Sequence, residues 1–107
     1  MENTGILYTA PEKFDAIATM DGTIKNIKED AILGIVVEVL NSDKVTTIYY
    51  SLSELNLAVG DSIKQGDVIG ISGTNKIDSS SNNMILFEVY IDGNLVNPEE
   101  YYNMQLS

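Results

Sequence analysis

Apolar and polar residues alternate along most of this chain, and Gly, Asn, Asp and Ser separate the short apolar runs. A period of two places every second side chain on one face of an extended strand, whereas a helix needs a period of 3.6 residues. Almost no part of the sequence keeps the helical period. The pattern therefore predicts a mainly β protein, with strands at residues 14–18, 23–27, 35–40, 45–50, 62–64, 68–71, 84–91 and 94–96.

Turn signals separate these strands. Asp21-Gly22 and Asp92-Gly93 are typical of two-residue hairpin turns of type I′, in which both central residues have positive φ. Residues 41–44 predict a looser turn between two strands. Residues 74–83 are too polar to pack and predict a long exposed loop, either a plain connection or a recognition loop.

One short helix is expected at residues 97–102, near the C-terminus. Asn97 can cap it, Pro98 suits its first position, and two glutamates follow at the positive end of the helix dipole. Its length limits it to covering one end of the sheet.

Chain length limits the number of cores. A chain of 107 residues buries roughly two thirds of the surface that it exposes when unfolded, which is enough for one core. We therefore expect a single domain over residues 1–107. The sequence contains no Cys, so packing alone must hold the fold.

Composition excludes several function classes. The chain has no His, which rules out serine triads and zinc sites built on imidazole. Its formal net charge is −10, from 16 acidic and 6 basic residues, so nucleic acid and anionic membrane surfaces are poor partners. No apolar run approaches the roughly 20 residues of a membrane-spanning helix, and no cofactor motif is present.

The last long predicted strand has two different faces. One face is uniformly apolar and is expected in the core: Ile85, Phe87, Val89 and Ile91. The other face is mixed and is expected to meet solvent or a cleft: Met84, Leu86, Glu88 and Tyr90.

Several segments resemble, in order and spacing, the LytM-type domain of peptidase family M23, the zinc endopeptidases that cut peptidoglycan cross-bridges. These segments are FDAIATMDGTIKNI, LGIVVEV, TTIYYSLSEL, VGDSIKQGDVIGISG, LFEVYIDG and NPEEY. The resemblance implies a small antiparallel β-sheet sandwich or barrel of the LytM type, also called the duplicated hybrid motif. Gly-Asp corners also occur in biotinyl and lipoyl carrier domains, but neither Lys64 nor Lys76 has the hairpin setting that a carrier lysine needs.

The same resemblance locates the family's active-site positions in this chain. Family members bind zinc through an early His-x-x-x-Asp pair and the second His of a late His-x-His, and two further histidines assist catalysis. Asn3, Leu7 and Leu86 stand at the three ligand positions, and Ser51 and Met84 stand at the catalytic histidines. Zinc needs nitrogen, thiolate or carboxylate donors. The resemblance therefore implies a degenerate domain with no catalytic residue, metal or cofactor, in which Met84 and Leu86 fill the space of the metal and Glu88 is a solvated carboxylate.

Within the family, the run from residue 12 to residue 55 resembles degenerate members that act in endospore formation and carry Ser in place of the catalytic His. This resemblance implies a scaffold anchored in the forespore membrane. Its partner would be a stage III sporulation protein AH-like extracytoplasmic domain, bound across the space between forespore and mother cell in a channel. The anchor would lie in a segment absent from this chain, which we expect to be a fragment.

Two other classes stay open. An inactive LytM-type regulator of cell-wall hydrolysis should show a basic or aromatic groove motif, and none is obvious. An enzyme would have to use Glu88, Asp67 or another carboxylate with an external metal, although a lone carboxylate lacks the partner that acid–base hydrolysis needs. A binding module should instead present edge strands that pair with another sheet.

Overall fold

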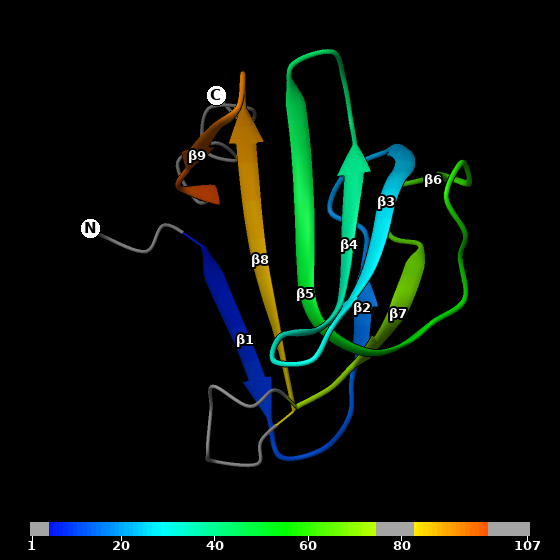
Figure 1. The fold of residues 1–107 in the computed structure, drawn as a ribbon, viewed down its shortest axis with the longest axis vertical. Helices are drawn as coiled ribbons and strands as arrows, with labels where there is room; N and C mark the ends of the chain where they lie inside the picture. The colour runs from blue at the N-terminus through cyan, green and yellow to red at the C-terminus, as the bar shows by residue number, and fades with distance from the viewer. Residues whose placement is uncertain (1–4, 75–82, 99–107) are drawn as a thin grey trace.

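The structure is a computed structural model that describes residues 5–74 and 83–98 (Figure 1). In this part of the chain, nine strands form one antiparallel sheet. They are β1 (Ile6–Ala10), β2 (Asp15–Ile17), β3 (Gly22–Asp30), β4 (Gly34–Leu40), β5 (Val45–Leu55), β6 (Ser62–Ile63), β7 (Val68–Ser72), β8 (Asn83–Ile91) and β9 (Asn94–Val96). The prediction of a mainly β, antiparallel architecture is confirmed.

The sheet forks along its longest strand. Hydrogen-bonded neighbours follow the order β1, β8, β5, β4, β3 and β6, and β9 also pairs with β8. Strand β5 pairs with β8 through residues 45–50 and with β7 through residues 52–55, and β2 joins the outer side of β7. Figure 1 shows β5 in the middle of the molecule, with β8 and β1 on one side and β4 and β3 on the other.

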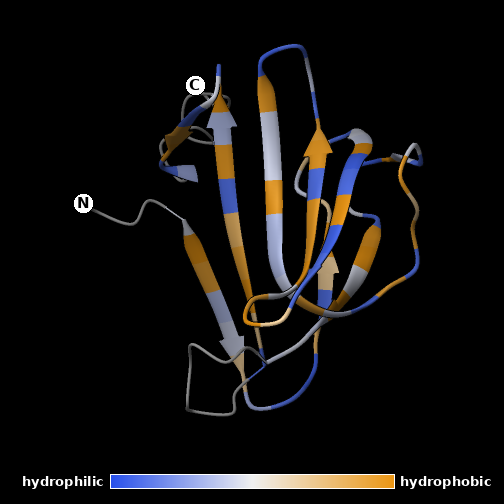
Figure 2. Cartoon of the chain, in the orientation of Figure 1, coloured by the Kyte–Doolittle hydropathy of each residue, from blue (hydrophilic) through white to orange (hydrophobic). Residues whose placement is uncertain are grey.

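The core lies between the parts of this forked sheet. Its buried side chains come from β2 to β8: Ala16, Ala18, Ile24, Val37, Val39, Tyr49, Leu52, Ile63, Ile69, Ile85, Phe87 and Val89. The rings of Tyr49 and Phe87 meet with their centroids 5.0 Å apart. Figure 2 shows that β8 is apolar along its first half and alternates between polar and apolar residues toward its C-terminal end.

All eight predicted strands exist, and two of them extend several residues further than predicted. Strand β3 reaches Asp30 and β5 reaches Leu55. Both strands therefore extend past the part of the sequence in which apolar and polar residues alternate. Strand β1 was not predicted. Its central residues are exposed and it lies at an edge of the sheet, so it carries no clear apolar pattern.

The two predicted hairpin turns have different outcomes. Asp92-Gly93 joins β8 to β9 with φ values of 53° and 80°, as a type I′ turn requires. The hairpin expected at Asp21-Gly22 is wrong, because β2 pairs with β7, and Gly22 starts β3 opposite Ile63 of β6. The long-range pairing partners override the local turn signal.

The remaining local predictions concern a turn, a helix and a loop. Residues 41–44 connect β4 to β5, and the backbone N–H of Asn41 donates to the carbonyl oxygen of Val45 at 2.9 Å. Most of the helix expected at 97–102 and most of the loop expected at 74–83 lie outside the described residues. Within the described ranges, no helix has the length and apolar character needed to cross a membrane.

Candidate functional site

One face of the β1-β8-β5-β4 sheet points away from the core. Opposite residues of an antiparallel pair share a face, so the strand registers identify its members. We call this surface the open face and define it by Leu7, Glu38, Ile48, Tyr50, Leu86, Glu88 and Tyr90. These side chains are half-buried or exposed.

Four of the five positions implied by the family resemblance meet at one end of the open face. Leu7 lies directly opposite Leu86, and Leu86 lies opposite Tyr50, the residue before Ser51. Met84 precedes Leu86 on the same strand and bridges to Gly73. The fifth position, Asn3, lies outside the described residues.

The burial of one of these side chains, Met84, differs from what the alternation along β8 predicts. Leu7 is 54% exposed, and Leu86 is half-buried. Met84 is only 2% exposed, because its strand meets the end of β7, where its N–H donates to the carbonyl oxygen of Gly73 at 2.7 Å. The expectation that the whole mixed face of β8 meets solvent or a cleft is therefore wrong at Met84.

Ser51 occupies the corner at which β5 leaves β8 for β7. It is fully buried and has a φ of 71°, a conformation that L residues other than Asn and Asp rarely adopt. Two glycines pack around this corner. A Cβ at Gly34 would lie 3.1 Å from Cα of Ser51, and a Cβ at Gly73 would lie 2.8 Å from its carbonyl oxygen. The backbone is therefore closely packed on both sides of the position of a catalytic histidine.

The side chains at the described ligand positions do not fit a zinc ion. Zinc in proteins takes imidazole nitrogen, thiolate sulfur or carboxylate oxygen, whereas Leu7 and Leu86 end in methyl groups. Within residues 5–74 and 83–98, no group of three or more His, Cys, Asp or Glu side chains could hold a metal ion.

The polar centre of the open face is a carboxylate between two phenols. The hydroxyl of Tyr50 donates to Oε1 of Glu88 at 2.7 Å, and the hydroxyl of Tyr90 donates to the same oxygen at 3.3 Å. Burial and the neighbouring Glu88 raise the pKa of Tyr50, and burial followed by Glu88 raises the pKa of Tyr90. Both phenols therefore stay protonated as donors near neutral pH.

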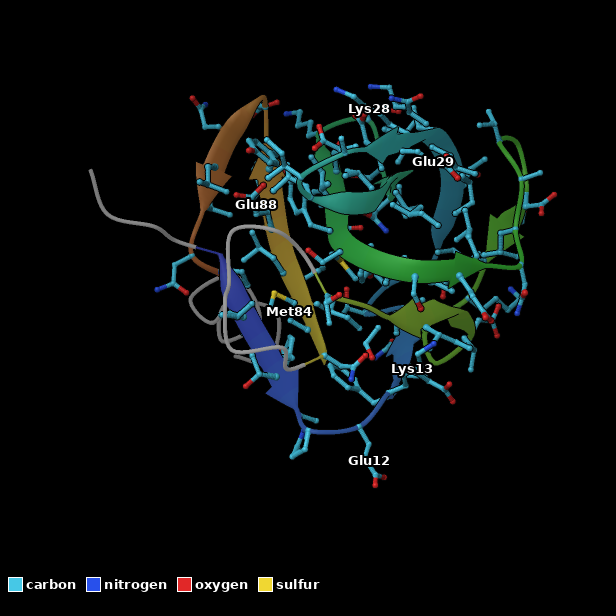
Figure 3. All side chains as sticks on the ribbon, turned by 60° about the horizontal axis from the view of Figure 1, so that its bottom comes forward. Glu12, Lys13, Lys28, Glu29, Met84 and Glu88 are labelled. Carbon is cyan, nitrogen blue, oxygen red and sulfur yellow. The ribbon has the colours of Figure 1, made fainter. Side chains whose placement is uncertain are left out.

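This cluster corrects the expectation of a solvated Glu88. Figure 3 labels Glu88 on β8. Its carboxylate is half-buried and hydrogen-bonded. The sequence placed Tyr90 on the same face as Glu88 but did not indicate Tyr50. The contact between Tyr50 and Glu88 depends on how β5 and β8 are paired. The available signal was the pair of adjacent tyrosines in β5, only one of which can face the core.

Two hollows flank the sheet. An open depression of about 480 Å³ lies on the open face beside Tyr90, and its lining includes the ion pair between Lys25 Nζ and Glu38 Oε2, 3.4 Å apart. A smaller, mainly apolar cavity of about 300 Å³ lies on the opposite face between β1, β2 and β8, against Tyr49 and Phe87.

Residues 1–98 match peptidase family M23, and the chain belongs to this family. The chain is 40% identical over 94 residues to stage II sporulation protein Q of Bacillus subtilis (strain 168). That match covers 88% of this chain and 33% of the relative, so the chain spans about a third of the relative's length.

Two solved structures are similar to this chain to different degrees. A chain of the SpoIIQ–SpoIIIAH pore-forming complex matches with a TM-score of 0.79 and 41% identity, over 84% of this chain and 57% of that one. The catalytic domain of lysostaphin from Staphylococcus simulans matches with a TM-score of 0.82 and 20% identity, over 94% of this chain and 79% of that one. The second likeness shows the fold alone.

Proposed function

We propose that this chain is a non-catalytic M23 domain that binds a SpoIIIAH-like extracytoplasmic protein domain during endospore formation. The observation that carries the proposal is the pair of leucines, Leu7 and Leu86, side by side at two of the positions where the family binds zinc. The fold is intact around them. The 40% identity to stage II sporulation protein Q and the match to its complex with SpoIIIAH support the choice of partner.

The chemistry of the open face favours binding over hydrolysis. Hydrolysis by protein groups needs a positioned general acid and base or an activated nucleophile. Glu88 is the carboxylate between two phenols, and both phenols donate to it. Ser51 is fully buried at the strand corner. In this proposal Asn3, Leu7 and Leu86 are vacant ligand positions, and Ser51 and Met84 are vacant catalytic positions.

Sheet edges offer one means of holding a protein partner. Among the described strands, β1 pairs only with β8, and β3 pairs with β6 only through Gly22 and Thr23. Unpaired N–H and C=O groups along such edges can accept a strand from another protein. We infer that main-chain pairing along one of these edges, together with side-chain contacts, forms the interface.

Our proposal also includes a membrane anchor outside this chain. The match to the sporulation relative covers a third of that protein, which leaves room for further segments in a longer protein. The domain would then face the space between forespore and mother cell, at the forespore membrane.

Titration with a soluble SpoIIIAH extracytoplasmic domain tests this function. We expect a complex at micromolar concentrations in low salt, measured by calorimetry. An absence of binding would reject the sporulation role and favour the inactive regulator of cell-wall hydrolysis. That alternative is tested separately, by measuring whether the domain changes the rate at which an amidase hydrolyses purified peptidoglycan.

Metal analysis tests the absence of zinc chemistry. After dialysis against zinc, we expect far less than one ion per chain, because leucine supplies no ligand atom. A catalytically active M23 domain, treated in the same way, is the positive control. A content of roughly one ion per chain would contradict the proposal, since a structural or catalytic site binds stoichiometrically.

A further inference from the structure

We propose that Glu88, Tyr50 and Tyr90 form a receptor for an arginine side chain of the partner protein. The inference rests on the proposed function, since it takes the ligand to be a protein. It adds the place on the open face where the partner binds and the chemistry that the partner presents there.

The two phenols orient the carboxylate. Both hydroxyls donate to Oε1 of Glu88, at 2.7 Å from Tyr50 and 3.3 Å from Tyr90. Their rings come from two strands, because Tyr50 lies on β5 and Tyr90 lies on β8 two residues beyond Glu88. A group that is already held in place loses less conformational entropy when it pairs with a ligand.

Among residues 5–74 and 83–98, no basic side chain forms a salt bridge with Glu88. In the described part of the chain, the one salt bridge joins Lys25 to Glu38. Phenol hydrogen bonds stabilise the charge of Glu88 without neutralising it. A half-buried carboxylate is therefore available to a positive group, and pairing becomes stronger as an interface removes water.

The surroundings favour a guanidinium over a bare ammonium or a metal ion. Arginine can stack on tyrosine rings while it donates to a carboxylate, and it loses hydration more readily than lysine. Leu7, Ile48 and Leu86 provide apolar surface on the same face, and Leu7 is 54% exposed. Apolar surroundings that exclude water are typical of the residues that dominate an interface.

A second copy of this chain cannot supply that group, because all six basic residues of the sequence are lysines. The net charge of −10 also opposes self-association and favours a basic partner surface. These two facts identify the occupant as a different protein that presents arginine among apolar side chains.

The test compares the affinity of three chains for a soluble SpoIIIAH extracytoplasmic domain: wild type, Glu88→Gln and Glu12→Gln. Glutamine keeps the shape and the hydrogen-bond acceptor but removes the charge. We expect Glu88→Gln to weaken binding at least about tenfold and to flatten its salt dependence. Glu12→Gln makes the same change in charge at an exposed site between β1 and β2, far from Glu88 in Figure 3, and should stay within about twofold.

Tyr90→Ala is a third variant, and it removes one ring face while leaving the charge of Glu88. We expect it to weaken binding about fivefold. Thermal unfolding of each variant identifies any variant that fails to fold.

The outcomes separate the two proposals. If wild type binds and Glu88→Gln binds equally well with the same salt dependence, the arginine receptor is wrong and the proposed function stands. If wild type does not bind, the proposed function fails and the receptor fails with it. If wild type forms a dimer that Glu88→Gln disrupts, the site holds a second copy, and the assignment to arginine is overturned.

Discussion

Leu86 lies directly opposite Leu7 on β1 and Tyr50 on β5, so it is flanked by a leucine and by a tyrosine whose hydroxyl is bonded to Glu88. Side chains directly opposite in an antiparallel sheet have Cβ atoms roughly 5 Å apart, close enough for contact. At the scale of single residues, the end of the open face that carries Leu7 and Leu86 is therefore mainly apolar. An imidazole placed at this end would find few partners for its ring nitrogens.

Restoring the family's late His-x-His motif should destabilise the domain. Met84 is 2% exposed, so Met84→His combined with Leu86→His should lower the free energy of unfolding by about 1 to 3 kcal/mol, the range for polar groups buried with imperfect partners. The double variant should remain inert toward peptidoglycan, because Leu7 still provides no ligand. Urea unfolding measures the change, with Leu7→His at a half-exposed position as the control. An unchanged urea midpoint would show that Met84 is not buried.

The raised pKa of Tyr50 predicts a loss of stability at high pH. Burial is the larger cause, and the neighbouring Glu88 adds to it. The folded chain keeps this phenol protonated above pH 10, the usual tyrosine pKa, whereas the unfolded chain ionises near that pH. Stability is therefore retained below that pH and falls as pH rises above it.

Tyr50→Phe should reduce the slope of this loss, and Glu88→Gln should reduce it by a smaller amount. Urea midpoints across the alkaline range measure the slope, and tyrosinate absorbance of the folded chain follows ionisation directly. Identical slopes in wild type and Tyr50→Phe would show that the phenol is not held protonated by the fold.

At the element scale, the fork in the sheet is the feature that places the site. Residues 45–50 of β5 pair with β8, residues 52–55 pair with β7, and the register shifts between Leu52 and Glu54. Gly70 of β7 lies opposite Leu55, and a Cβ at this glycine would collide with the carbonyl oxygen of Glu54. The close approach of β5 and β7 therefore depends on glycine at position 70.

Gly70→Ala should open this pairing and destabilise the domain by about 1 to 3 kcal/mol, the usual range for overpacking. Val68→Ala on the same strand is the matched control. Val68 is 44% exposed, so its truncation should change stability by less than about 1 kcal/mol. Chemical unfolding measures both variants, and equal effects would contradict the close approach of the two strands.

The sequence predicted the strands whose apolar residues alternate, and the family resemblance predicted which positions meet. Leu7 and Leu86 were expected at ligand positions, and the β1–β8 register brings them together. Pairing between distant strands was not predictable from local signals, so a hairpin was wrongly expected at Asp21-Gly22, and strand β1 and the burial of Met84 were missed. The Tyr50–Glu88 contact was missed for the same reason, since 38 residues separate its two members.

At the scale of the whole molecule, excess negative charge sets long-range behaviour. The formal net charge of −10 is distributed over a chain of 107 residues, in which a single salt bridge joins described residues. Most carboxylates therefore contribute to the field around the domain instead of cancelling locally. Such a field speeds the approach of a basic partner and slows the approach of an acidic one.

Association with a SpoIIIAH-like domain should therefore be slower in high salt. The Debye length is about 8 Å at physiological ionic strength and about 3 Å at 1 M, so added salt screens the attraction before the two surfaces meet. We expect the association rate constant to fall steeply with salt, and the dissociation rate constant to change less, because contacts already formed exclude salt. Stopped-flow or surface-binding kinetics over a salt series measures both constants.

Glu12→Gln should lower the association rate slightly and leave dissociation unchanged, since Glu12 is exposed and contributes only to the field. An association rate that does not vary with salt would show that the acidic charge of this domain has no part in finding its partner.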